Sequence, residues 1–241
     1  MQFWLGFAPQ MIDGELYLQA LDLKKNILPL LDCPTTTPHK PGGVIVIDPG
    51  HGGGNTGAQS VLDGRFEKEF TLDWARRLAP LLEKRGWRVF LTRTDDLEIP
   101  LPDRVLIAEQ HNADFFLSLH FNSSPNGSYQ EGIESYCLTP PGLPSSLVRE
   151  FDDDPSLVFP NNAFDVQNLQ YAARLQRAML EIDGNTDRGV RRARFMGVLR
   201  RQNRPAVLLE GGYLSNPSEA RRIESPEFRQ ELAEAVAKAL E

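Results

Sequence analysis

Two patterns of apolar and polar positions follow each other along most of the chain. Unbroken β-branched runs such as Val44 to Ile47, stopped by Pro49 and Gly50, are typical of strands buried on both faces of a sheet. Helical spacing, as in Phe70, Trp74 and Leu78, predicts amphipathic helices. We expect strands at 44–47, 87–92, 114–120, 133–138, 195–200 and 206–210, and helices at 66–85, 102–111, 166–182 and 227–241. The alternation predicts one α/β domain over residues 42–241, with a mostly parallel or mixed central sheet flanked by helices.

The first 41 residues follow neither pattern for long. Residues 6–18 alternate loosely around an Asp-Gly turn pair, and residues 19–31 have rough helical spacing. The stretch 33–41 is rich in Pro and Thr and has the composition of a linker. We therefore expect residues 1–41 to form a small N-terminal appendage and linker, the remnant of a preceding module.

Prolines mark two further features. Pro80 lies inside a predicted helix, where it removes a hydrogen bond, so we expect a bend or a restart there. Residues 139–165 hold five prolines and form a longer loop than a compact domain needs. Such loops are usually functional or mobile. Whether this loop covers a site as a lid is left open.

Composition excludes some classes of protein. A net charge of -7 and a pI of about 5.2 argue against a nucleic-acid binder. The one strongly basic stretch, Arg188 to Arg204, is interpreted as a solvated face. Cys33 and Cys137 are read as free or buried thiols. No run reaches the ~18–20 apolar residues of a membrane helix. The first seven residues lack a signal peptide, so either the protein is cytosolic or the printed sequence is a trimmed form, and the function inferred below favours the trimmed form.

Candidate chemistry lies at or just past the carboxyl ends of predicted strands, where His51, His120 and Glu210 stand. In open α/β sheets the ligand crevice lies outside those ends. Two histidines there favour a metal, because imidazole is the usual nitrogen ligand of zinc. A catalytic zinc site needs a third protein ligand. Glu67, at the start of the next predicted helix, and His111, late in another, are both candidates, and the pattern does not decide between them.

Glu210 is left to act as a general base on a water molecule beside the metal, with an ion pair to an arginine as the structural alternative. The stretch Gly52 to Gly57 matches G-x-G-x-x-G, but no predicted helix opens directly at these glycines, so we interpret the dinucleotide match as accidental. The P-loop motif and the serine hydrolase motif G-x-S-x-G do not occur.

An ordered set of segments resembles one known family, the zinc-dependent N-acetylmuramoyl-L-alanine amidases of the type 3 group. The segments are VIVIDPGHGG at 44–53, FEK at 66–68, LTR at 91–93, FLSLHFN at 116–122 and PAVLLEGGYLSN at 205–216. Each segment alone is weak, but their order and spacing over residues 43–241 are specific.

The resemblance implies that His51, Glu67 and His120 bind one Zn²⁺ and that Glu210 is the catalytic residue. It implies hydrolysis of the amide between the lactyl group of N-acetylmuramic acid and L-alanine of the stem peptide. Peptidoglycan or muropeptides would then be the partners. Asn122 is expected to hydrogen-bond near His120.

The same resemblance sets further expectations. Gly211 and Tyr213 stand where the family often has Thr and Phe, which we expect to alter the rim of the substrate site. Peptidoglycan catabolism, as in cell division, places the protein in the periplasm or the extracellular cell wall. The protein partners that we expect are an activator protein or an N-terminal targeting module. The alternatives are a zinc peptidase or deacylase that acts on another amide, and a non-catalytic wall-binding relative.

Overall fold

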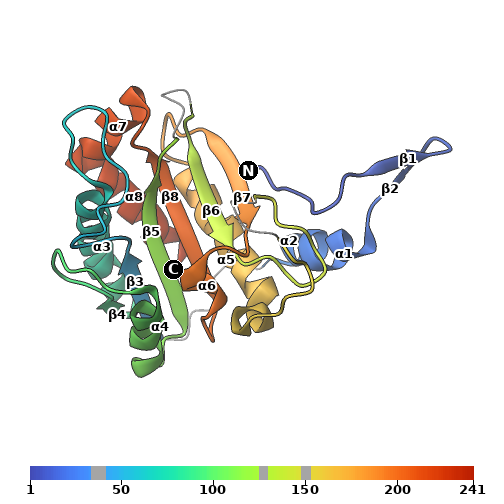
Figure 1. Cartoon of the computed structure of the whole chain (residues 1–241), viewed down its shortest axis with the longest axis horizontal. Coiled ribbons are helices and arrows are strands. Elements are labelled where there is room, and N and C mark those ends of the chain that lie inside the picture. Colours follow the sequence, from blue (N-terminus) through green and yellow to red (C-terminus); the bar gives the residue numbers. More distant parts are fainter. Residues whose placement is uncertain (34–41, 125–129, 148–152) are drawn as a thin grey trace.

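A six-stranded mixed sheet forms the centre of the computed structural model, which describes residues 1–33, 42–124, 130–147 and 153–241 (Figure 1). The sheet order is β4-β3-β5-β8-β6-β7. The strands are β3 (Val44–Pro49), β4 (Arg88–Leu91), β5 (Phe115–Asn122), β6 (Ile133–Cys137), β7 (Asp187–Arg192) and β8 (Ala206–Tyr213). Strands β4, β3, β5 and β8 are parallel, whereas β6 is antiparallel to β8 and β7 is parallel to β6. The expected α/β fold with a mixed sheet is confirmed.

Helices cover the two faces of the sheet with different cores. On one face, α3 (Glu67–Glu83), α5 (Asp165–Met179) and α8 (Pro226–Ala239) join strand residues such as Leu117 in the larger apolar cluster. On the other, α4 (Leu101–Gln110) and α6 (Gly197–Arg200) join Phe116 and Leu208 in a smaller one. Because side chains alternate along a strand, His120 and Glu210 lie on the same face as this smaller cluster.

Several expected elements need correction. The strand predicted at 195–200 is wrong, because residues 197–200 form the short helix α6, whose Val198 and Leu199 are buried. Strand β7 and helix α7 (Pro217–Glu224) were not predicted. The restart given as one alternative at Pro80 is wrong, because α3 continues through it, and the bend given as the other stays a prediction. Pro80 lies in the last turn, where only one backbone hydrogen bond is lost. In the described part of the long loop 139–165, residues Pro160–Phe164 form the short 3-10 helix η2.

The basic stretch 188–204 is not a solvated face. Arg192 and Arg194 are only 2% and 5% exposed. Arg194 binds Asp153 at 2.6 Å, and Arg192 donates to the carbonyl of Leu138 at 3.0 Å. A buried guanidinium is tolerated only with such partners. These arginines, at and just after the end of β7, therefore hold in place part of the long loop and the residue that follows β6.

The appendage lies at the β7 edge of the sheet. Strands β1 (Gln10–Ile12) and β2 (Glu15–Tyr17) form the expected hairpin, which projects away from the body of the protein (Figure 1). The helical stretch that follows comprises α1 (Ala20–Asp22), the π-helical η1 (Leu23–Ile27) and α2 (Leu28–Leu31), and it packs on α5. Most of the expected linker, residues 34–41, lies outside the described residues.

Two remaining expectations concern thiols and membranes. Cys33 and Cys137 are not joined in a disulfide, and Cys137 is buried. Within the described ranges, none of the helices combines the length and apolar character that a membrane crossing requires.

Candidate metal centre

His51 is presented by an unusual backbone at the exit of β3. Its φ is 64°, in the left-handed region that a non-glycine residue seldom adopts. The ring is fixed by a contact of 2.8 Å between Nδ1 and the amide oxygen of Asn55. This contact favours the tautomer in which Nδ1 carries the proton and Nε2 is left to bind a metal.

Two buried arginines hold the loop in this conformation. Arg104 donates to the carbonyl of His51 at 2.7 Å and to that of Pro49 at 3.0 Å. Arg93 donates to the carbonyls of Pro49 at 3.0 Å and Gly50 at 2.9 Å. Three consecutive carbonyls are thus bound by guanidinium groups, which explains how the strained turn persists.

Arg104 is itself anchored to a buried acid. Its guanidinium lies 2.6 Å from Asp48, the last residue but one of β3. Burial would raise the pKa of Asp48, but the charge of Arg104 and hydrogen bonds from Thr92, Ser118 and Arg104 keep that pKa below its usual value. Sequence reasoning missed this pair, although an aspartate at the end of an apolar β-branched run could have indicated it.

Glu67 is the first residue of α3 and only 4% exposed. The backbone amide of Ala58 donates to Oε2 at 2.9 Å, and the amide of Phe121 donates to Oε1 at 3.0 Å. The loop after His51 therefore returns the Glu67 carboxylate to the sheet edge. The choice of Glu67 as the third ligand required this placement. The other alternative, His111, is exposed and stacks on Phe90 with a centroid distance of 3.7 Å.

His120 lies near the end of β5 and packs against Gly50. A Cβ added at Gly50 would lie 2.3 Å from Cε1 of His120, so only glycine fits there. Gly57 has a similar role on the other side, where a Cβ would lie 2.6 Å from Oε2 of Glu67. These two glycines leave the space that the histidine and the carboxylate occupy.

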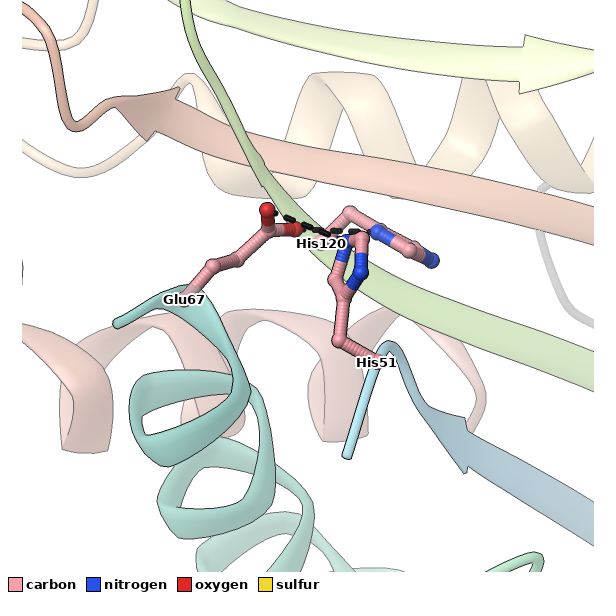
Figure 2. A group of neighbouring side chains, drawn as sticks. All are labelled: His51, Glu67 and His120. Carbon is pink, nitrogen blue, oxygen red and sulfur yellow. Dashed lines mark hydrogen bonds and ion pairs between the residues drawn. The ribbon is translucent and has the colours of Figure 1, made fainter. Parts of the chain in front are cut away.

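His51, Glu67 and His120 form one compact group (Figure 2). Nε2 of His51 lies 3.1 Å from Oε2 of Glu67, and Nδ1 of His120 lies 2.9 Å from Oε1. One ligand atom from each residue lies within 4.8 Å of the others. Two imidazole nitrogens and a carboxylate oxygen at this separation could hold a metal ion.

The electrostatics fit a cation between these groups. Burial by itself would raise the pKa of Glu67, but hydrogen bonds and charges from His120 and His51 hold it well below its usual range. Burial would lower the pKa of His51, yet the Glu67 carboxylate raises it. The carboxylate is therefore ionised at neutral pH and attracts positive charge, whether a proton or a metal.

Glu210 faces the same group from β8. It is the register partner of His120 across the parallel β5–β8 pair and is 8% exposed. A cavity of about 360 Å³ is lined by Glu210, His51, Glu67 and His120, and also by Asn122. The structure thus brings together four of the residues for which the sequence predicted a metal-binding or catalytic role, His51, Glu67, His120 and Glu210, whereas the candidate ligand His111 lies elsewhere. The predicted hydrogen bond of Asn122 stays a prediction.

A second hollow of about 250 Å³ shares His51 and His120 with the first. Its other lining residues include Arg104 and the loop 98–101. The glycine loop at 52–57 borders this region as a turn closed by hydrogen bonds between Gly52 and Asn55, and the next helix begins only at Glu67. The structure therefore agrees that the dinucleotide motif is accidental.

Comparison with known sequences shows what the chain resembles. The family model described as N-acetylmuramoyl-L-alanine amidase matches residues 45–241. The amidase AmiC of Escherichia coli O6:H1 strain CFT073 is 33% identical over 239 residues, covering 89% of this chain and 56% of the relative. AmiA of Escherichia coli K12 is 30% identical over 215 residues, covering 80% of this chain and 73% of the relative. The chain thus spans little more than half the length of AmiC.

Solved structures agree with this result. An N-acetylmuramoyl-L-alanine amidase from Clostridium difficile 630 superposes with a TM-score of 0.69 at 30% identity, covering 83% of this chain and 96% of that one. The amidase AmiC2 of Nostoc punctiforme gives a TM-score of 0.68 at 33% identity, covering 82% and 94%. The fold, the grouped side chains and the match over residues 45–241 lead to one conclusion: the chain belongs to the N-acetylmuramoyl-L-alanine amidase family.

Proposed function

We propose that the protein hydrolyses the amide between the lactyl group of N-acetylmuramic acid and L-alanine of peptidoglycan stem peptides, with one zinc ion bound by His51, Glu67 and His120. The observation that carries this proposal is the shared cavity. The three candidate ligands and Glu210 line the same space of about 360 Å³. Family membership supplies the substrate class.

Zinc fits the donor set. Catalytic zinc sites take three protein ligands from histidine nitrogens and carboxylate oxygens and keep one position open. The chemistry that such an ion supplies when bound is Lewis acidity, which polarises the amide carbonyl and makes an adjacent water molecule acidic. Glycines at positions 50 and 57 leave room for the side chains that would bind the ion.

Glu210 would carry the protons. As general base it takes a proton from the attacking water, whose oxygen bonds to the lactyl carbonyl carbon. When the carbon–nitrogen bond breaks, the same carboxyl group gives the proton to the leaving nitrogen of L-alanine. The products are a lactyl carboxylate on the sugar and a free amine on the peptide.

The substrate also defines a location and partners. We infer that the protein acts where peptidoglycan lies, in the periplasm or the extracellular cell wall, and that residues 1–41 are an appendage and linker left from a preceding module. An activator protein or an N-terminal targeting module would be its protein partner. Turnover of peptidoglycan at cell division is the process that such an activity would serve.

Digestion of purified muropeptides tests the proposal. We expect mass spectrometry to find intact stem peptide with a free L-alanine amine and sugar with a free lactyl carboxylate. Chelation should stop the reaction and Zn²⁺ should restore it. Glu210→Gln should keep one zinc per chain and lose turnover by about 10²–10⁴-fold. Cleavage within the peptide would instead make the protein a peptidase. Binding to cell walls without any cleavage would make it a wall-binding relative.

A further inference from the structure

A second buried carboxylate stands beside the candidate base. Glu134 of β6 is the register partner of Glu210 across the antiparallel β6–β8 pair. Directly opposed residues of an antiparallel pair point to the same face, with Cβ atoms about 4.5–5.5 Å apart. Glu134 is 2% exposed and Glu210 is 8% exposed. Like charges at such a position repel each other unless other groups compensate them.

Three hydrogen-bond donors and a second guanidinium surround the Glu134 carboxylate. Arg188 donates through Nε to Oε1, and the hydroxyl of Tyr213 donates to the same oxygen at 2.8 Å. The hydroxyl of Tyr136 donates to Oε2 at 2.6 Å, and Nε of Arg191 lies 3.6 Å from it. Burial and the charge of Glu134 raise the pKa of both phenols, so they remain protonated donors.

The appendage supports this cluster from the outer edge of the sheet. The guanidinium of Arg191 lies 4.4 Å from the ring centroid of Trp4. The indole of Trp4 donates to the backbone carbonyl of Arg188 at 3.4 Å, and Val190 donates to the carbonyl of Gln2 at 3.1 Å. Residues 2–4 thus brace β7, which carries both arginines.

Without Glu134, these arginines would be attractive partners for Glu210. Strands β8 and β7 are separated by β6 alone, a distance of roughly 10 Å between their backbones. The long side chains of arginine and glutamate can bridge much of that gap across the same face. A desolvated guanidinium binds a carboxylate strongly. Such a pair would draw Glu210 away from His51 and His120.

We propose that Glu134 is a positioning residue for Glu210. It neutralises Arg188 and Arg191, which prevents them from pairing with Glu210, and its like charge turns the Glu210 carboxylate toward the cavity of the metal centre. The role rests on the proposed function and extends it to residues outside the metal-ligand motifs, including Trp4 of the appendage.

A charge-removing variant with a rescue tests the role. Glu134→Gln keeps the shape of the side chain and removes its charge. We expect kcat to fall by about a hundredfold, as for a misplaced catalytic group, with KM and zinc content unchanged. Adding Arg188→Met and Arg191→Met removes the competing cations, and we expect this triple variant to recover at least about tenfold of the loss. Glu131→Gln, an exposed acid near the same strand, is the matched control and should match wild type.

A crystal structure of Glu134→Gln provides the readout that needs no turnover. We expect the Glu210 carboxylate within ion-pair distance of Arg188 or Arg191. A Glu210 in its original place, an unchanged kcat, or a triple variant no better than the single one would overturn the proposal. Because the structure is independent of substrate, it decides the role of Glu134 even if the wild-type protein leaves muropeptides intact, a result that would refute only the proposed function.

Discussion

The candidate metal centre and the surroundings of Glu210 are built in different ways. His51 and His120 are placed by backbone features: a left-handed turn, a glycine contact and carbonyls held by buried arginines. Glu210 lies beside a network of charged side chains that reaches from β6 to the appendage. The first kind of site fails when the backbone cannot take its shape. The activity that depends on the second kind of site should change by a limited amount with each charge that is added or removed.

Removing a ligand should have the largest effect. His51→Ala takes away one of the two imidazoles, so we expect the protein to lose its zinc and all measurable turnover while it remains folded. Metal analysis after gel filtration, together with circular dichroism, checks this. One zinc per chain in the variant would mean that His51 is not a ligand.

The support of the His51 loop comes next. Arg104→Met leaves Asp48 buried without its ion-pair partner, which should cost about 3–5 kcal/mol in the free energy of unfolding. Urea unfolding measures the loss. Lys238→Met breaks the exposed pair with Glu181 and should leave stability unchanged within error. Equal effects in the two variants would contradict the loop-clamping role of Arg104.

Replacing Gly50 with alanine adds a single methyl group, and this change alone should weaken zinc binding. In Gly50→Ala the new Cβ would overlap the His120 ring, so we expect zinc affinity to fall by roughly 10–100-fold. Competition with a zinc-binding dye measures this affinity. In Gly54→Ala the nearest atom is the flexible carboxylate of Glu98 at 3.0 Å, so this variant should bind zinc normally. Wild-type affinity in Gly50→Ala would show that His120 does not need its present position.

As the pH is lowered, zinc affinity should begin to fall at a higher pH than it would if His51 had the pKa of an ordinary histidine. In the metal-free protein the pKa of His51 is raised above its usual value of about 6.5, because Glu67 stabilises the imidazolium. A ligand nitrogen must lose its proton to bind, so affinity should fall by about tenfold per pH unit below that raised pKa. Titrations between pH 5 and 8 test the sign. A fall that begins only below about pH 6 would contradict it.

Removing a contact at the outer edge of the charged network should have the smallest effect on kcat. Trp4→Ala removes the ring that Arg191 contacts, and a contact of about 0.5–1 kcal/mol corresponds to a two- to fivefold change in kcat. Tyr17→Ala, which alters the exposed hairpin of the same appendage, should have no effect. If both variants behave alike, the appendage does not influence the site through Arg191.

The sequence predicted the grouping of residues at the candidate metal centre better than it predicted the charged network. His51, His120 and Glu210 follow apolar β-branched strands, and the ends of such strands are visible in a hydrophobic pattern. The strand Asp187–Arg192 is almost entirely polar and reads as a charged surface until its partners are known. Likewise, the short apolar stretch at 195–200 fits a strand or a helix equally well. The sequence around Glu134 contains no pattern that indicates a role, because that role depends on which residue lies opposite Glu134 on the neighbouring strand.

Hydrolysis of a defined muropeptide in ¹⁸O-labelled water tests the central claim most directly. If the metal centre and Glu210 direct water to the lactyl carbonyl, one ¹⁸O atom will appear in the lactyl carboxylate of the sugar product. The released stem peptide will carry no label, and Glu210→Gln will form both products about 10²–10⁴-fold more slowly while it still holds zinc. Label in a peptide carboxylate, or a Glu210→Gln protein with wild-type turnover, would contradict the account.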